Sequence, residues 1–214
     1  MTRRYIQRAR AEAAQQTRRQ ILDAARAAVL TGNRLEFSVG EIAEDASVAR
    51  STIYSVFGSR AGLLSALADD TLQRAGLAEV IAAYGREDAS EALEGSLRAS
   101  CRMYAAEHPV FARLLVLARI DPEAAEPLSR SERDRATGMA HLAARLAVQR
   151  RLRAGVSVEH AVDVLSLLTS FWSFDELFSG RGLDADASSD VLLEIARSIV
   201  LPAGDPLERR PAGA

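Results

Sequence analysis

The stretch from Ala46 to Arg60, ASVARSTIYSVFGSR, has the pattern of a short helix with two different sides. Ile53, Val56 and Phe57 lie three and four residues apart, so they share one side of a helix that spans about Ala49 to Phe57. The opposite side is polar and consists of Arg50, Ser51, Thr52, Tyr54 and Ser55. Small residues let a helix approach a groove, and hydroxyl and guanidinium groups bind phosphates and base edges. This side is therefore typical of a helix that reads DNA.

The neighbouring segments complete a helix-turn-helix around this stretch. Ser38 and Glu41 have the S-x-x-E spacing of a capping box, which predicts a short helix that begins at Ser38 and breaks near Ser47. A longer helix, about Ala11 to Leu30, precedes it, and two short helices joined by a tight turn are typical of the motif. Gly58-Ser59-Arg60 opens the next helix, where free backbone N–H groups beside an arginine favour phosphate binding.

The block from Phe37 to Phe57, followed by Ser59-Arg60 and Leu63-Leu64, resembles the DNA-binding domain of the tetracycline-repressor (TetR) family. The resemblance covers roughly residues 15–70. It implies an all-α transcriptional regulator, usually a repressor, that binds double-stranded palindromic operator DNA as a homodimer. The DNA contacts that it implies are Ser38 and Tyr54 on phosphates, Arg50, Ser51 and Thr52 at recognition positions, and Arg60 in place of the usual lysine.

Three positions depart from the family's pattern. Ser47 stands where glycine is common, and a left-handed backbone there carries roughly 1 kcal/mol of strain. Ala49 replaces a frequent capping serine, and the loss of that cap costs about 1 kcal/mol. Val56 replaces a common histidine. These changes concern individual DNA contacts and leave the prediction of the motif unchanged.

Basic residues concentrate at the start of the chain. All 27 are arginines, and six of them lie in the first 20 residues beside a single glutamate. A basic end on a chain of net charge −2 favours a polyanionic partner at that end. We therefore expect residues 1–14 to form a basic arm whose Arg3 and Arg4 contact DNA. The alternative is a solvated extension of the first helix.

The rest of the chain has helical periodicity and no strand-like alternation longer than a few residues. We expect an all-α fold of about nine helices, with single helices at residues 59–84 and 157–179. The helix-turn-helix domain is expected at 15–62, a helical ligand-binding and dimerisation domain at 63–201, and a disordered tail at 202–214. One cysteine, no visible signal peptide and no apolar stretch long enough for a bilayer predict a cytoplasmic protein without membrane contact.

The larger domain is expected to bind a small, largely apolar effector. Its predicted helices between Asp88 and Phe178 present apolar residues with a few polar groups, which is the composition of a small-molecule pocket. The candidate lining residues, which serve equally well as plain core, are Leu97, Cys101, Tyr104, Phe111, Leu115, Met139, Leu142, Leu168, Thr169 and Trp172.

The segment Val164 to Phe174 is apolar on almost every side, so a helix there must be buried all round. A second copy of the chain would supply part of that cover, and a central helix of a monomer is the alternative. The family resemblance implies that the last two long helices pair with their two-fold mates in a four-helix bundle. The expected interface residues are Leu165, Phe171, Phe174, Val191, Leu192, Ile195 and Ile199.

The sequence contains no recognisable catalytic motif. His108, His141 and His160 lie on different expected helices, and no Cys/His pair has the spacing of metal ligands. We therefore expect no catalytic residue, no metal and no cofactor. Two alternatives remain. One is an all-helical small-molecule-binding or enzymatic protein whose first helices merely resemble the motif, and the other is a DNA-binding regulator controlled by a protein partner.

Overall fold

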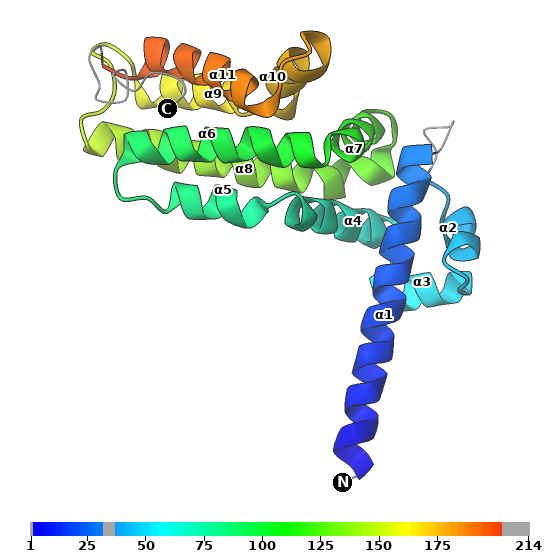
Figure 1. Cartoon of the computed structure of the whole chain (residues 1–214). Helices are drawn as coiled ribbons and strands as arrows, with labels where there is room; N and C mark the ends of the chain where they lie inside the picture. Colours follow the sequence, from blue (N-terminus) through cyan, green and yellow to red (C-terminus); the bar gives the residue numbers. More distant parts are fainter. Residues whose placement is uncertain (1, 32–36, 203–214) are drawn as a thin grey trace. The chain divides into compact units, whose positions relative to one another are not determined.

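The computed structural model describes residues 2–31 and 37–202, with all their side chains except those of residues 2–6 and 128. These residues form helices and connecting segments without a β-strand, which confirms the all-α fold class (Figure 1). Beyond Pro202, the predicted disordered tail lies outside the described residues. The elements are α1 (Thr2–Thr31), α2 (Val39–Asp45), α3 (Arg50–Phe57), α4 (Arg60–Arg74), α5 (Leu77–Tyr84), α6 (Ala89–Ala106), α7 (His108–Ile120), α8 (Pro122–Val148), α9 (Val158–Leu168), α10 (Phe171–Asp175), the π-helical η1 (Glu176–Gly180) and α11 (Ala185–Val200).

The chain divides into two compact units. Unit 1 comprises Met1–Thr71 and Pro109–Ser129, so it combines α1 to α3 and most of α4 with α7 and the start of α8. Unit 2 comprises Leu72–His108 and Arg130–Ala214, and it includes α5, α6, most of α8, and α9 to α11. Unit 1 therefore extends past the predicted helix-turn-helix domain and takes in a segment that was assigned to the ligand-binding domain.

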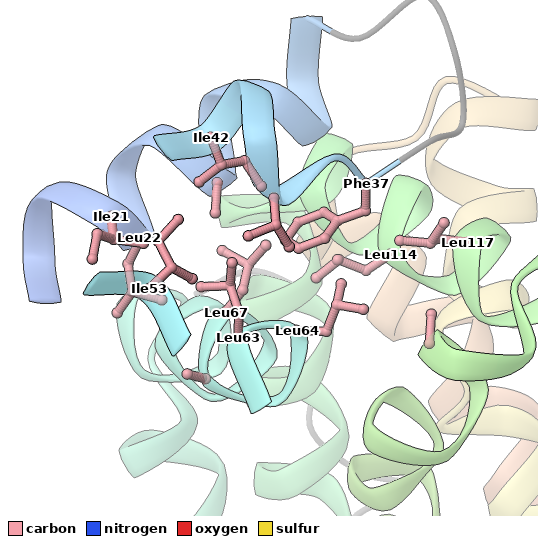
Figure 2. Packing of buried hydrophobic residues seen from close by; sticks show 14 of the residues in the cluster. Ile21, Leu22, Phe37, Ile42, Ile53, Leu63, Leu64, Leu67, Leu114 and Leu117 are labelled. Atoms are coloured by element: carbon pink, nitrogen blue, oxygen red, sulfur yellow. The ribbon is translucent and has the colours of Figure 1, made fainter. Parts of the chain in front are cut away.

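One apolar cluster holds unit 1 together (Figure 2). Leu114 and Leu117 of α7 pack beside Phe37 and Leu64, so α7 belongs to the same core as the helix-turn-helix. The larger buried members are Ile21, Leu22, Phe37, Val39, Ile42, Ile53, Leu63, Leu64, Leu67, Val110, Leu114 and Leu117.

Local sequence signals shape the turn between α2 and α3. Ser38 caps α2, since its side chain accepts the N–H of Glu41 at 3.4 Å, as the capping-box spacing predicts. Ser47 has a φ of 54°, which is the left-handed backbone expected at that position. Ala49 precedes α3 without a side-chain cap, as expected for alanine. The predicted helix-turn-helix is therefore confirmed.

Unit 2 is built around α6, which packs against α5 and α11, while α11 also packs against α9. Two ion pairs join α6 to α11. Arg98 Nη1 lies 2.7 Å from Asp190 Oδ1, and Arg197 Nη2 lies 3.0 Å from Glu94 Oε2. These partly buried pairs fix how α11 lies along α6.

The expectation of about nine helices is wrong, because two predicted helices are interrupted and the described residues form eleven α-helices. The segment 59–84 breaks at Gly76, whose φ of 96° is incompatible with a continuous right-handed helix. The segment 157–179 breaks at Ser170, whose side chain accepts the N–H of Ser173 at 3.2 Å and so caps α10. The apolar periodicity continues through both breaks and did not reveal them.

Candidate nucleic-acid interface

A single deeply buried side chain anchors α3. Ile53 is 0% exposed in the core of unit 1, and Val56 and Phe57 pack partly buried against the same cluster, as the apolar side of the helix predicts. Thr52 is partly buried. The other predicted DNA contacts of α3 are exposed, and they are Arg50, Ser51, Tyr54 and Ser55. The polar side of α3 is therefore accessible along its length.

Two of the predicted DNA contacts meet at Gly40 of α2. A Cβ added at Gly40 would lie 3.7 Å from Ser38 Oγ and 3.9 Å from the Cζ of Arg50. Both are ordinary van der Waals distances, so the Ser38 hydroxyl and the Arg50 guanidinium both lie near the start of α2. Hydroxyl and guanidinium groups are common partners of DNA phosphates.

Arg18, which the sequence analysis did not single out, braces the end of α3. Its Cζ lies 4.6 Å from the centroid of the Phe57 ring, within cation–π distance. The contact ties α1 to the last residue of α3. Its spacing could have predicted this contact, because Arg18 lies three and four residues before the buried Ile21 and Leu22 and shares their helix face.

Arg60, the predicted phosphate contact at the start of α4, is engaged by the protein itself. Its Nε donates to the carbonyl oxygen of Phe37 at 3.0 Å, its Nη1 donates to Glu123 at 3.0 Å, and its Nη2 pairs with Asp121. The hydrogen bond from Arg60 lowers the pKa of the Asp121 carboxyl. Both carboxylates lie where α7 ends and α8 begins, far from Arg60 in the sequence. Patterns over a few residues therefore could not predict this pairing.

The first half of α1 is an exposed basic helix. α1 begins at Thr2 instead of near Ala11, so residues 2–14 are helical. Alanine and arginine make up most of this segment, and their high helix propensity explains the extension. The side chains of residues 7–16 are exposed, and Arg8 pairs with Glu12 at 2.9 Å. The side chains of Arg3 and Arg4 lie outside the described residues.

Most of the predicted effector-lining residues lie inside unit 2. Seven of them are at most 7% exposed: Leu97, Cys101, Tyr104, Met139, Leu142, Leu168 and Thr169. Trp172 is 37% exposed and lies at the surface. Phe111 and Leu115 belong to α7 in unit 1. Seven of the ten candidates therefore lie in the interior of unit 2, and their role as an effector lining stays a prediction.

Arg135 is a largely buried cation that the sequence analysis missed. Its Nη1 donates to a backbone carbonyl of α9 at 2.7 Å and to the Thr169 hydroxyl at 3.0 Å, and its Nη2 pairs with Glu132 at 2.9 Å. Its Nε is buried and meets no acceptor among the described residues. The Tyr104 hydroxyl donates to the carbonyl of Thr169 at 3.3 Å, so these residues form one polar group in the interior. Arg135 lies four residues before Met139, on the apolar stripe of α8, and this spacing could have indicated that its side chain points inward.

The group formed by His108, Asp175 and Ser179 does not have the geometry of a catalytic triad. Asp175 Oδ1 and Ser179 Oγ both approach Nε2 of His108, at 2.6 Å and 3.0 Å. A catalytic triad needs its acid and its nucleophile on opposite ring nitrogens. Burial raises the pKa of the Cys101 thiol to about 12, so Cys101 is protonated and unreactive at neutral pH.

The described part of the chain contains no group of three or more His, Cys, Asp or Glu side chains that could hold a metal ion. None of its helices combines the length and the apolar character that a membrane span needs.

The predicted dimer residues separate into two groups. Four of them are at most 4% exposed and pack inside the chain: Leu165, Phe171, Phe174 and Leu192. The Phe171 ring, for example, meets the Tyr104 ring edge-on at 5.5 Å between centroids. The remaining three, Val191, Ile195 and Ile199, are partly exposed on α11, with Ile195 at 38%. Leu167 of α9, which the prediction omitted, is 66% exposed.

Residues 21–67, which include the end of α1 and all of α2 and α3, match the family model of the bacterial regulatory proteins of the tetR family. Comparison with curated proteins finds no significant match.

Solved structures resemble the chain over most of its length. A Rhodococcus sp. protein assigned to the TetR-family transcriptional regulators is 19% identical with a TM-score of 0.64, and the match covers 86% of this chain and 98% of that one. FadR from Bacillus subtilis, solved with stearoyl-CoA, is 18% identical with a TM-score of 0.63 over 83% of this chain and 96% of that one. The ketosteroid transcriptional regulator KstR2 of Mycobacterium tuberculosis is 17% identical with a TM-score of 0.61 over 86% and 94%. Residues 21–67 therefore match the tetR family of bacterial regulatory proteins, and the chain has the fold of solved TetR-family transcriptional regulators.

Proposed function

We propose that this chain is a homodimeric transcriptional repressor that binds palindromic operator DNA through α3 and is released by a small, largely apolar effector. The observation that carries the proposal is the two-sided α3 in a tetR-family domain. Ile53 holds the helix in the core, while Arg50, Ser51, Tyr54 and Ser55 remain exposed. Ser38 and Arg50, which both lie near Gly40, are proposed to contact phosphates beside α3.

The exposed start of α1 is proposed to add a second contact to the DNA backbone. Because residues 2–14 are helical, this contact differs from the flexible minor-groove arm of other DNA-binding domains. Deletion of residues 2–10 is expected to weaken binding and to flatten its dependence on salt concentration. An unchanged salt dependence would leave the segment without a role in DNA binding.

Dimerisation is proposed to use the outward apolar residues of α9 and α11. Leu167 is 66% and Ile195 38% exposed, and Val191 and Ile199 are partly exposed beside Ile195 on α11. Two chains related by a two-fold axis would present two α3 helices to half-sites about one helical turn or more apart. Leu167→Glu combined with Ile195→Glu is expected to give monomers in light scattering, whereas His160→Glu, at an exposed position of α9, is the matched control.

The effector is proposed to enter the interior of unit 2, which is apolar with few polar groups. The buried Nε of Arg135 and the hydroxyl of Tyr104 are the proposed hydrogen-bonding groups. The complex of Bacillus subtilis FadR with stearoyl-CoA supports ligands with long apolar chains as the first class to test. A hundredfold loss of DNA affinity needs about 2.7 kcal/mol of coupling, which lies within the usual allosteric range.

Selection of DNA by the purified protein from a randomised duplex library tests the DNA-binding role. We expect enrichment of a palindromic site. Thr52→Ala and Tyr54→Ala are expected to weaken binding to that site at unchanged stability, and Ser198→Ala, at an exposed position of α11, serves as the control. Enrichment of no site, or equal binding by all four proteins, would refute the proposal.

A thermal-shift screen with fatty acids and acyl-CoA thioesters tests the effector role. Each ligand that raises the melting temperature is then titrated into the protein–DNA complex, and release of the DNA is the expected result. Ligands that bind tightly and leave DNA affinity unchanged would refute the coupling. Absence of any ligand would favour control by a protein partner.

A further inference from the structure

Arg60 lies where a DNA phosphate would be expected to bind. It is the first residue of α4 and follows the end of α3 after only Gly58 and Ser59. Ser59 caps α4, its Oγ accepting the N–H of Gly62 at 2.9 Å. The start of a helix with a guanidinium beside it attracts phosphate, through both the backbone N–H groups and the charge.

In the structure, two carboxylates already neutralise this guanidinium. Nη1 donates to Glu123 at 3.0 Å and Nη2 pairs with Asp121, while Nε is used by the carbonyl oxygen of Phe37. One positive and two negative charges leave a local surplus of one negative charge. The side chains of Arg60 and Asp121 are each only 21% exposed, so solvent screens this pair less than a surface pair. A phosphate approaching α4 therefore meets repulsion where an unpaired arginine would attract it.

The core of unit 1 positions the acidic corner beside Arg60. Asp121 precedes α8 and accepts the N–H groups of Glu123 at 3.0 Å and Ala124 at 3.3 Å. Ala124 is 0% exposed, and Leu117, one turn before Asp121, packs in the same core as Phe37 (Figure 2). Packing on both sides of the corner thus places Asp121 against Arg60.

We propose that Asp121 and Glu123 form an autoinhibitory latch that competes with the DNA phosphate backbone for Arg60. This inference rests on the proposed DNA-binding function. With the latch closed, Arg60 contributes no net charge to DNA binding. A rearrangement that withdraws the corner between α7 and α8 frees the guanidinium for a phosphate and raises DNA affinity, so the corner sets the affinity of unit 1.

Neutralising the latch tests the proposal. Asp121→Asn combined with Glu123→Gln keeps side chains that can cap α8 and removes both charges. Binding to a fluorescein-labelled mixed-sequence duplex, measured by anisotropy between about 50 and 200 mM salt, is expected to tighten roughly threefold to tenfold. The slope of log affinity against log salt should steepen by about 0.9, as one further phosphate is neutralised. Glu123→Gln alone, at a residue whose side chain is 72% exposed, should give part of the gain without touching the cap.

Two comparisons make the result specific to Arg60. Adding Arg60→Gln to the latch variant should abolish the steepening of the salt slope, whereas Arg60→Gln alone leaves two unpaired carboxylates and should weaken binding. Asp69→Asn combined with Asp134→Asn changes net charge equally at exposed carboxylates and should not steepen the slope. Unchanged or weaker binding by the latch variant, or the same gain without Arg60, would overturn the latch. The proposed DNA-binding function would still stand if the wild-type protein binds the duplex. Failure of every form to bind the duplex at low salt would refute both.

Discussion

Truncation of Ile53 should separate the folding role of α3 from its role in contacting DNA. Ile53 is the only fully buried residue of α3, at 0% exposure. Ile53→Ala removes three buried carbon atoms, which at about 0.8 kcal/mol each gives roughly 2.4 kcal/mol of lost transfer free energy. The cavity left behind increases the loss, so the expected total is about 2–5 kcal/mol, whereas Ile53→Val is expected to cost about 1 kcal/mol.

The loss should fall on the docking of α3. A change of about 2.8 kcal/mol raises the population of the undocked helix roughly a hundredfold. Ser51 lies two residues before Ile53, but its side chain is on the exposed side of the helix. Ser51→Ala is therefore the matched control. It should leave stability within about 0.5 kcal/mol of the wild type, as expected for surface positions, while it weakens DNA binding.

Urea unfolding followed by circular dichroism measures the change in stability, and hydrogen exchange of residues 50–57 locates it. Ile53→Ala should shift the unfolding midpoint to lower urea and speed exchange in α3 first. A stability within about 0.5 kcal/mol of the wild type, or a cost for Ile53→Val equal to that for Ile53→Ala, would contradict the assignment of Ile53 as the anchor.

Three further predictions concern local features. Asp88→Ala is expected to destabilise the protein by about 1–2 kcal/mol in urea unfolding, because Asp88 caps α6 by accepting the N–H groups of Ser90 and Glu91. The hydrogen bond from the Glu91 amide is the main cause of the lowered pKa of Asp88. The contribution of Asp88 to the free energy of unfolding is thus complete above its ordinary pKa of 3.8 and is lost as the pH falls through the lowered pKa. The Asp88→Asn variant should therefore lose less stability on acidification than the wild type. Because burial raises the pKa of Cys101 to about 12, a thiol reagent at pH 8 should modify the native protein about a hundredfold more slowly than the urea-unfolded protein, and equal rates would contradict this burial. Ser47→Gly should stabilise by about 0.5 kcal/mol, since relief of roughly 1 kcal/mol of left-handed strain exceeds an entropy cost of about 0.5 kcal/mol for glycine. A lower melting temperature would count against this strain.

The helix-turn-helix was predictable because its signals act over a few residues. The S-x-x-E spacing at Ser38, the apolar triad around Ile53 and the left-handed Ser47 each depend on neighbours within one or two helical turns, and the structure has all three. Periodicity likewise indicated an all-α chain. It failed at Gly76 and Ser170, because an apolar stripe continues across a break when the next helix packs on the same core.

Only the tertiary structure decided which side chains were accessible. The sequence placed Leu165 and Phe174 on an apolar helix and predicted them at a dimer interface. Their burial inside the chain, and the exposure of Leu167, depend on neighbouring helices. The availability of Arg60 for DNA likewise depends on the tertiary structure. Its sequence position predicts a phosphate contact, yet its partner Asp121 lies 61 residues further along the chain. An ion pair depends on distance in space, and the packing of α7 into the core of unit 1 brings these two residues together.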